Sequence, residues 1–397
     1  MDPSRPLPFP QSRSSGPHAG LPEPDAESAA SSARLVRRIE AAIVAAGGWL
    51  PFDRYMQMAL YEPGLGYYDG SRVKFGAPGD YVTAPEISPL FARALAAQVA
   101  QAFTQAPVPP RVLEFGAGSG ALADGLIAEL ARLGCAVERY SIVEVSADLR
   151  ARQRARLGAT GSAVEWLTAP PSGFRGVIVA NEVLDVMPVK LFVKRGCSVL
   201  ERGVVAAAKG GLAFGERPAS APLAREVASI EAQTVTLPDG YGSEVGLAAQ
   251  AWTASLAGWL EQGVALLVDY GFPRPEYYHP QRIMGTVMCH YRHRAHAEPL
   301  WLPGLNDITA HVDFSAIAAA GSQAGLDVLG YTSQSRFLLN CGLLDLLGPD
   351  PRPQQAAEAQ RLLSEAEMGE LIKVIAFGRG VGMPLLGFSH GDRTHRL

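Results

Sequence analysis

The chain has 397 residues, of which 48% are hydrophobic, and its formal net charge is -4. This length can bury a large core in one elaborated domain or two, and the charge gives no electrostatic basis for binding nucleic acid. The four cysteines lie far apart without a CxxC pair, and no apolar run reaches the roughly 20 residues that span a bilayer. We therefore expect a soluble cytoplasmic protein that does not insert into membranes.

The N-terminal quarter of the chain divides into two parts. Residues 1–32 are rich in Pro, Ser, Gly and Ala without apolar periodicity, so we expect a disordered tail. Residues 33–107 carry helical patterns at 33–46, 51–60 and 89–103, which predict a helical cap with a lid.

The lid prediction concerns residues 75–88, which mix turn formers with small polar residues. One interpretation is a structural lead-in, in which Ser88 caps the following helix and Glu86 is solvated. The other is a lid over a bound cofactor that includes Thr83 and Glu86, because long aperiodic loops are more often functional than ornamental.

The most informative stretch is an apolar run that ends at Glu114 and continues into Gly116, Gly118 and Gly120. It predicts a buried strand, a tight loop and a helix N-terminus, where glycines let a ligand approach the backbone. A dinucleotide-binding loop or a purely structural turn also fits the glycines. Glu114 favours S-adenosylmethionine, because a carboxylate there suits its cationic ammonium and sulfonium groups and would oppose a pyrophosphate.

From residue 111 onward, strand and helix patterns alternate, which predicts an α/β fold with a parallel sheet and crossover helices. We expect a core over 108–397 with seven sheet strands, the last of them an edge hairpin partner, and insertions at about 194–243 and 271–312. Ligands of such sheets bind beyond the carboxyl ends of the strands. Glu144 ends the next strand and is expected to hold a ribose, and Trp166 is expected near the adenine.

Three polar residues follow the apolar strand 176–180, and they are the candidate catalytic residues. They are Asn181, Glu182 and Asp185. If a helical turn begins there, Glu182 and Asp185 share one face and can bind a cationic acceptor such as an arginine guanidinium. In the alternative, Asp185 caps the next segment and Glu182 is solvated.

Aromatic, histidine and arginine side chains crowd residues 277–296. The Cys/His spacing suggests zinc, but neighbouring arginines would repel a metal and no second ligand set is recognisable, so we expect no metal. A plain basic surface also fits. The functional alternative is a substrate-contacting loop, with His290, Arg292, His293 and, from the polar run that follows, His311 as candidate substrate-binding residues.

With these residues in view, the chain resembles the MidA-like family over about residues 35–380. The resemblance is carried by the motifs Tyr61-x-Pro63-x-x-Gly66-Tyr67-Tyr68, Gly79-Asp80-Tyr81-x-Thr83-x-Pro85-Glu86-Ile87-Ser88, Glu114-x-Gly116-x-Gly118-x-Gly120, Val143-Glu144-Val145-Ser146, Asn181-Glu182-x-x-Asp185-x-x-Pro188, Asp269-Tyr270-Gly271 and 307–314.

The resemblance implies a class I methyltransferase (Rossmann-like) fold with an N-terminal helical cap and S-adenosylmethionine as cofactor. Mitochondrial members of this family are protein arginine methyltransferases that assist complex I assembly, so a complex I subunit homologue is the implied partner. Asn181 stands where those members usually carry His. A small-molecule methyltransferase and a non-catalytic assembly chaperone that retains a cofactor pocket are the alternative functions.

Overall fold

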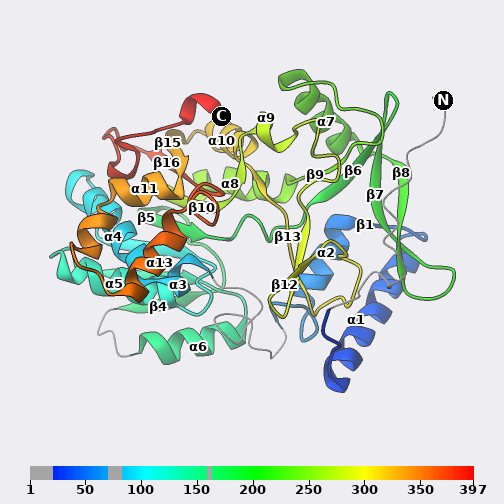
Figure 1. Ribbon diagram of the computed structural model, residues 1–397, viewed down its shortest axis with the longest axis horizontal. Helices are drawn as coiled ribbons and strands as arrows, with labels where there is room; N and C mark the ends of the chain where they lie inside the picture. The colour runs from blue at the N-terminus through cyan, green and yellow to red at the C-terminus, as the bar shows by residue number, and fades with distance from the viewer. Residues whose placement is uncertain (1–20, 70–82, 159–162) are drawn as a thin grey trace.

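The computed structural model describes residues 21–69, 83–158 and 163–397; the expected tail residues 1–20 and lid residues 75–82 lie outside these ranges. Figure 1 shows a larger α/β lobe and a smaller lobe. The smaller lobe is built around a second sheet and includes the N-terminal helices. None of the helices in the described ranges has both the length and the apolar character needed to cross a membrane.

The bounds of the elements are as follows. The helices are α1 (Ala26–Ala45), α2 (Phe52–Tyr61), α3 (Ala84–Ile87), α4 (Pro89–Gln105), α5 (Ala121–Arg132), α6 (Ala147–Leu157), α7 (Ala221–Gln233), α8 (Leu247–Trp259), α9 (Arg274–Tyr277), α10 (Phe314–Gln323), α11 (Gln334–Asn340), α12 (Leu343–Leu347) and α13 (Pro353–Leu363), with short 3-10 turns η1 (Leu386–Phe388) and η2 (Thr394–Arg396). The strands are β1 (Leu50–Pro51), β2 (Arg111–Phe115), β3 (Arg139–Val143), β4 (Val164–Leu167), β5 (Phe174–Asn181), β6 (Lys190–Arg195), β7 (Ser198–Ala206), β8 (Leu212–Pro218), β9 (Gly242–Val245), β10 (Leu260–Phe272), β11 (Met288–Tyr291), β12 (Arg294–His296), β13 (Asp307–Thr309), β14 (Val312–Asp313), β15 (Asp327–Ser333) and β16 (Ile372–Arg379).

The main sheet of the described residues has the strand order β15-β16-β10-β5-β2-β3-β4, with the short β14 beside the end of β10. The pairs from β10 to β4 are parallel, whereas β16 is antiparallel to both β10 and β15. The expectation that the last strand lies at the edge is therefore wrong. Seven of its eight residues, Ile372 to Gly378, are buried, which suits a central strand rather than an edge.

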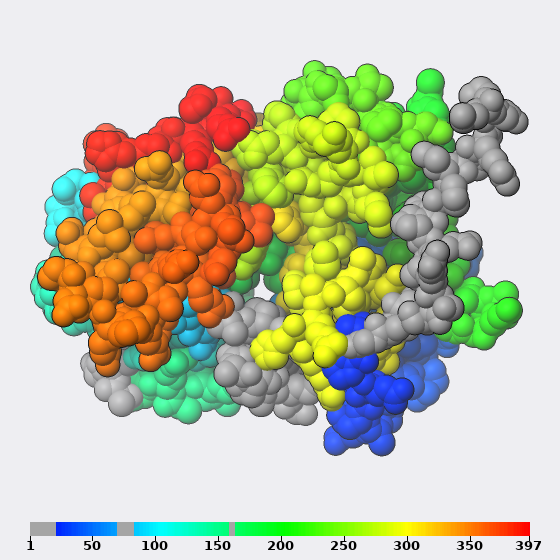
Figure 2. Space-filling model, viewed as in Figure 1, coloured from blue at the N-terminus to red at the C-terminus, as the bar shows by residue number. Residues whose placement is uncertain are grey.

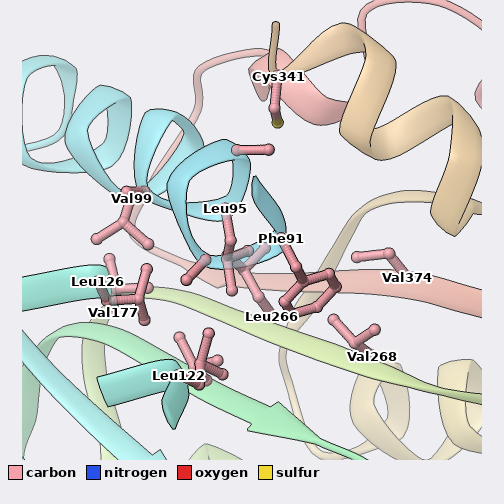
Figure 3. Close-up of a cluster of buried hydrophobic side chains, with 14 of the residues drawn as sticks. Phe91, Leu95, Val99, Leu122, Leu126, Val177, Leu266, Val268, Cys341 and Val374 are labelled. Carbon is pink, nitrogen blue, oxygen red and sulfur yellow. The ribbon is translucent and has the colours of Figure 1, made fainter. Parts of the chain in front are cut away.

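Helices cover both faces of this sheet, as the alternation in the sequence predicts. Strand residues such as Val177, Leu266 and Val374 face a core built with α4, α5 and α11–α13. Figure 3 shows Phe91, Leu95 and Val99 of α4 projecting onto that face. Their neighbours of opposite parity pack on the other face against α8 and α10. Burial on both faces fixes the register of the strands, and with it the positions of their carboxyl ends.

A second sheet carries the smaller lobe. Its order is β1-β7-β6-β9, with β8 beside β7, so the insertion expected from about residue 194 begins at Lys190. The helices α1 and α2 pack on this sheet, together with Cys289 and Ile308 of a three-stranded sheet, β12-β11-β13. The segment that contains β11, β12 and β13 lies between the two lobes, beside the main sheet (Figure 1).

Two boundaries of the expected N-terminal region differ from the structure. Helix α1 begins at Ala26, inside the expected tail, because Asp25 caps it by accepting from the Ser28 backbone N–H at 2.8 Å, and Ser32 donates to the Pro303 carbonyl at 2.9 Å. Helix α4, expected in the cap, belongs to the core of the larger lobe, because its apolar residues such as Leu95 are fully buried against the main sheet.

Candidate active site

A cavity of about 430 Å³ lies at the carboxyl ends of β2, β3 and β5. Residues of the glycine loop and the strand ends form one wall, and the segment after α2 together with α3 forms the opposite wall. The lining residues include Tyr61, Tyr68, Thr83, Glu86, Glu114, Gly116, Gly118, Glu144, Asn181 and Glu182. The structure therefore gathers most of the predicted cofactor residues and two of the predicted catalytic residues around one space.

The glycine loop has the backbone geometry that its sequence predicts. Gly116, Gly118 and Gly120 have φ angles of +64°, +53° and +82°, in the left-handed region that favours glycine. A Cβ at Gly116 would lie 2.8 Å from Val183 Cγ2. Gly120 is the N-cap of α5 and stands behind the cavity wall, so it shapes the loop rather than lining the space.

Glu114 is almost completely buried, with 2% exposure, at the end of β2. Its Oε2 accepts a hydrogen bond from the Tyr140 hydroxyl at 2.8 Å. Burial, with a smaller contribution from the charge of Glu144, raises the pKa of Glu114 to about 8, although the bond from Tyr140 acts in the opposite direction. A cationic group at this wall would favour the ionised form.

Glu144 is held by a chain of hydrogen bonds that begins at Trp166. The Trp166 Nε1 donates to Gln153 Oε1 at 2.9 Å, and Gln153 Nε2 donates to Glu144 Oε2 at 3.2 Å and to the Gly118 carbonyl at 3.0 Å. Trp166, expected near the adenine, is not among the residues that line the first cavity, and the Arg154 guanidinium lies over its ring, 5.1 Å from the ring centroid. Trp166 positions Gln153, which in turn joins the glycine loop to Glu144.

Of the predicted lid residues that the structure describes, Glu86 contacts the glycine loop. Thr83 is the N-cap residue of α3. Glu86 accepts a hydrogen bond from the Ser119 hydroxyl and forms an ion pair with Arg156 at 3.5 Å. The interpretation of Glu86 as a merely solvated side chain is therefore wrong, while Ser88 does cap α4 by accepting from Leu90 N–H at 3.3 Å.

A second cavity, of about 360 Å³, adjoins the first at Glu182, which lines both. Its walls come from the turn after β5, from the end of β10 and from the β11–β13 sheet. The lining residues include Glu182, Asp185, Tyr270, Thr286, Met288, His290, Asp307 and His311. Figure 2 shows a hollow between the orange C-terminal segments and the yellow segment that contains β11 and β12.

The turn that carries Glu182 and Asp185 is fixed by one buried carboxylate at the end of β10. Asp269 Oδ2 accepts from the backbone N–H groups of Val183, Leu184 and Asp185 at 3.0, 2.8 and 3.3 Å. Glu182, with a φ angle of +53°, donates its own N–H to the Val268 carbonyl at 2.8 Å. This left-handed conformation at a non-glycine residue is uncommon, and here both neighbouring strands hold it in place.

Four carboxyl groups meet at this junction, and the charges of Asp269 and Asp307 act on both Glu182 and Asp185. Burial first, and then the charge of Asp269, raise the pKa of Glu182 to about 8 and that of Asp185 well above its ordinary value. Burial raises the pKa of Asp269 to about 7 against the opposing effect of its backbone donors. The fourth, Asp307, accepts from the Tyr68 hydroxyl at 2.9 Å.

Asp185 has an unpartnered oxygen. Its side chain is buried, and no donor in the described ranges of the chain reaches Oδ1. Asn181 donates from Nδ2 to Glu182 Oε1 at 3.1 Å, and its own Oδ1 is likewise without a donor from that part of the chain. A buried acceptor without a donor is costly, so these oxygens suit a ligand that donates hydrogen bonds.

The four predicted substrate residues fall into two groups. His290 and His311 line the second cavity. Arg292 and His293 occupy the exposed turn between β11 and β12, where Arg292 donates to the Glu23 carbonyl and to Asp25 at 3.2 and 3.3 Å. Neither residue lines the second cavity, and Arg292 lies beside the segment that precedes α1.

The surroundings of His311 favour the neutral form of its imidazole. Its ring stacks on Phe272, with centroids 5.3 Å apart, and its backbone N–H donates to Thr286 Oγ1 at 2.9 Å. Burial first, and then the positive charges of Arg282 and Lys373, lower the pKa of His311 to about 4, so its imidazole is neutral at pH 7. In the described residues, no group of three or more His, Cys, Asp or Glu side chains is arranged to hold a metal ion.

Comparisons with known proteins agree with this geometry. Residues 94–332 match a family described as S-adenosyl-L-methionine-dependent methyltransferases. The chain belongs to this family. A crystal structure from Burkholderia thailandensis bound to S-adenosyl-homocysteine is 50% identical, has a TM-score of 0.90, and the match covers 95% of this chain and 100% of that one. A native structure from the same organism is 49% identical, with a TM-score of 0.88 and the same coverage.

Curated relatives are more distant. The chain is 28% identical over 414 residues to the mitochondrial protein arginine methyltransferase NDUFAF7 homolog of Drosophila melanogaster, covering 92% of each chain. It is 28% identical over 365 residues to mitochondrial NDUFAF7 of Mus musculus, covering 81% of this chain and 79% of that protein. The predicted class I methyltransferase fold, enzyme class and S-adenosylmethionine cofactor are confirmed.

The first cavity fits this cofactor on structural grounds. Its volume falls in the range of about 300–1,000 Å³ that is usual for small-ligand sites. Carboxylates at the ends of β2 and β3 flank a glycine loop at the N-terminus of α5, as Glu114 and Glu144 show. The first cavity of this methyltransferase thus offers the cofactor an anionic wall and a backbone that it can approach closely.

The sequence analysis did not select several residues that the structure brings into the site. Asp269 and Asp307 complete the carboxyl cluster, and Tyr61 and Tyr68 line the first cavity, with rings stacked 5.5 Å apart. Asp269 could have been found by the signal that identified Glu114, since it also ends an apolar strand. Asp307 begins the run 307–314 that shares in the family resemblance, but the sequence does not show that it reaches the cluster, since the fold of the β11–β13 sheet brings it there.

We predict that Gly118→Val weakens S-adenosylmethionine binding by roughly a hundredfold or more, because the side chain would project from a loop that lines the cavity. Gly134→Val is the matched control: its φ angle of +74° imposes similar backbone strain, but nothing lies within 4 Å of its added Cβ. Titration calorimetry on both folded variants measures the difference. Equal affinity in the two variants would contradict the assignment of the loop.

Proposed function

We propose that this methyltransferase transfers a methyl group to an arginine nitrogen of a protein, with a subunit homologue of respiratory complex I as the acceptor. The observation that carries the proposal is a buried oxygen, Asp185 Oδ1, that no donor from the described residues reaches, in an acidic cavity that adjoins the cofactor cavity at Glu182. Similarity to relatives named protein arginine methyltransferases supports the choice of arginine. The complex I partner and a cytoplasmic location rest on the resemblance and the sequence alone.

A guanidinium suits the second cavity for two physical reasons. It donates hydrogen bonds in a planar fork, which matches pairs of carboxylate oxygens such as those of Asp185 and Glu182. It also brings a positive charge. That charge offsets burial and, after it, the repulsion between the carboxylates, which together raise the pKa values of Glu182 and Asp185.

The roles of the residues follow from the two cavities. S-adenosylmethionine supplies the methyl group on a cationic sulfur. Glu114 and the backbone of the glycine loop would hold its charged amino acid part, while Glu144, held by Gln153, would accept from the ribose hydroxyls. Thr83 and Glu86 would close the opposite wall.

Glu182 stands where the reacting groups would meet. The new carbon–nitrogen bond forms as the carbon–sulfur bond breaks, so the acceptor nitrogen, methyl carbon and sulfur must lie in line, and the enzyme acts chiefly by orientation. Asp185 and Asp307 would orient the guanidinium, and Asn181 would orient Glu182 through its bond to Oε1. Glu182 would polarise the nitrogen and accept the proton that it loses, because free arginine has a pKa above about 12.

The raised pKa values predict that the affinity for a cationic ligand depends on pH, and they determine whether it rises or falls. Without a cation, Glu114 and Glu182, each with a pKa raised to about 8, are largely protonated near neutral pH. A cationic ligand favours the ionised forms, so its binding releases protons and strengthens as pH rises.

We therefore predict that S-adenosylmethionine affinity increases between about pH 6 and pH 7.5, by up to tenfold per unit for each proton released. Calorimetry in buffers of different ionisation enthalpy counts the protons. Glu114→Gln should flatten the dependence, whereas Glu165→Gln, on β4 with 41% side-chain exposure, should leave it unchanged. A pH-independent affinity in the parent enzyme would argue against a cation at Glu114.

We predict that Asp185→Asn lowers methyl transfer to protein by about 100-fold or more, because the acceptor loses an ionic partner in a buried cavity. S-adenosylmethionine affinity should change by less than about twofold, since Asp185 lines only the second cavity. Transfer of labelled methyl groups to extract proteins measures the first effect, with Asp327→Asn, an exposed substitution on β15, as control. Unchanged transfer by Asp185→Asn would overturn the proposed acceptor site.

A further inference from the structure

Three exposed apolar side chains, called the rim here, lie on the loop before β11 and at the first residue of that strand. Ile283, Met284 and Met288 expose 54%, 73% and 36% of their surfaces, although each is a large apolar side chain. Met288 lines the second cavity, and so does Thr286, which follows Ile283 and Met284 in the chain, so the loop that carries the rim leads into the cavity wall. Such clustering is unusual, because isolated exposed apolar residues are common whereas grouped ones mark binding surfaces.

The loop that carries the rim is held from several sides. Thr286 donates from its backbone N–H and its hydroxyl to the buried Glu244 Oε1, at 2.9 and 2.6 Å. The Ile283 carbonyl accepts from Gly242 N–H at 3.0 Å, and Arg282 donates to the carbonyls of Glu276 and Tyr277 at 2.7 and 3.0 Å. The apolar side chains therefore point outward from an anchored backbone.

The anchoring of this loop lowers the conformational entropy that the enzyme loses when a partner binds. At Gly285 the φ angle is +70°, and a Cβ there would lie 2.1 Å from Glu244 Oε2, so the loop passes close to its anchor. A flexible loop could fold its apolar side chains inward, but this one presents them in a fixed place. A partner that covers a preorganised surface loses little conformational freedom from the enzyme side.

We infer that the rim binds apolar side chains flanking the acceptor arginine in an extended protein segment; this inference rests on the proposed function. The stem of an arginine side chain would pass Met288 into the acidic cavity, leaving its backbone at the mouth. In an extended segment alternate side chains point the same way, about 6.6 Å apart. The residues two positions before and after the arginine are therefore placed to contact the rim.

The occupant is a protein segment rather than a free metabolite because the surface has two parts of different chemistry. The cavity selects a cationic group through Asp185 and Glu182, and the rim beside it selects apolar groups. A small guanidino compound could satisfy only the cavity. A chain with apolar side chains on both sides of an arginine satisfies both parts.

Four synthetic peptides test the inference by fluorescence anisotropy with saturating S-adenosyl-homocysteine. Each has either arginine or its neutral isostere citrulline at the centre, and either leucine or serine two positions away on both sides. We expect the leucine–arginine peptide to bind about tenfold more tightly than the serine–arginine peptide. In the Ile283→Ser/Met284→Ser double variant this preference should fall below about twofold, and it should persist in the control Val44→Ser/Leu344→Ser, whose parent side chains are 75% and 56% exposed elsewhere.

The two changes in the peptides, arginine to citrulline and leucine to serine, separate this inference from the proposed function. Equal binding of leucine and serine peptides, a leucine preference that survives in the double variant, or no binding of any peptide would overturn the role of the rim. Equal binding of arginine and citrulline peptides with a retained leucine preference would instead overturn the arginine cavity and leave an apolar docking surface.

Discussion

The site depends on one buried carboxylate that satisfies the backbone of a turn. Asp269, at the end of β10, accepts from three consecutive N–H groups of the turn that follows β5. Charge-assisted bonds to a carboxylate are stronger than neutral ones, and here they join two neighbouring parallel strands at their carboxyl ends. This contact holds Glu182 between the two cavities and Asp185 against the second. The walls of the two cavities therefore share one rigid element.

The same arrangement brings several carboxyl groups together in the protein interior, where folded proteins normally avoid negative charge. Glu182, Asp185 and Asp269 are buried together, and burial raises the pKa of all three; the charge of Asp269 raises the pKa values of Glu182 and Asp185 further. Clusters of this kind lower stability unless a ligand compensates them, and they are found where function requires them. A sulfonium in one cavity and a guanidinium in the next would supply that compensation, each from its own side of Glu182.

Sequence reasoning succeeded where chemistry lies within one contiguous stretch. The Gly116–Gly118–Gly120 loop and its flanking Glu114 form a local pattern whose backbone needs can be deduced without the fold, and the alternation of strands and helices gave the α/β class. It failed where contacts come from distant segments. Asp307 joins the cluster through the β11–β13 sheet, Trp166 acts behind Gln153, and β16 inserts between β10 and β15. The position of Arg292 beside the segment that precedes α1 could not be deduced, because composition does not reveal which way a hairpin turn faces.

The identity of the methylated atom tests the central claim most directly. The purified enzyme is incubated with methyl-labelled S-adenosylmethionine and cell extract, protein is separated from small molecules, and the labelled protein is hydrolysed to amino acids. Label in methylated arginine, on a band that mass spectrometry assigns to a complex I subunit homologue, is the result that two cavities meeting at Glu182 predict. Label in another amino acid, or only in the small-molecule fraction, would contradict the assignment of the acidic cavity to a protein guanidinium.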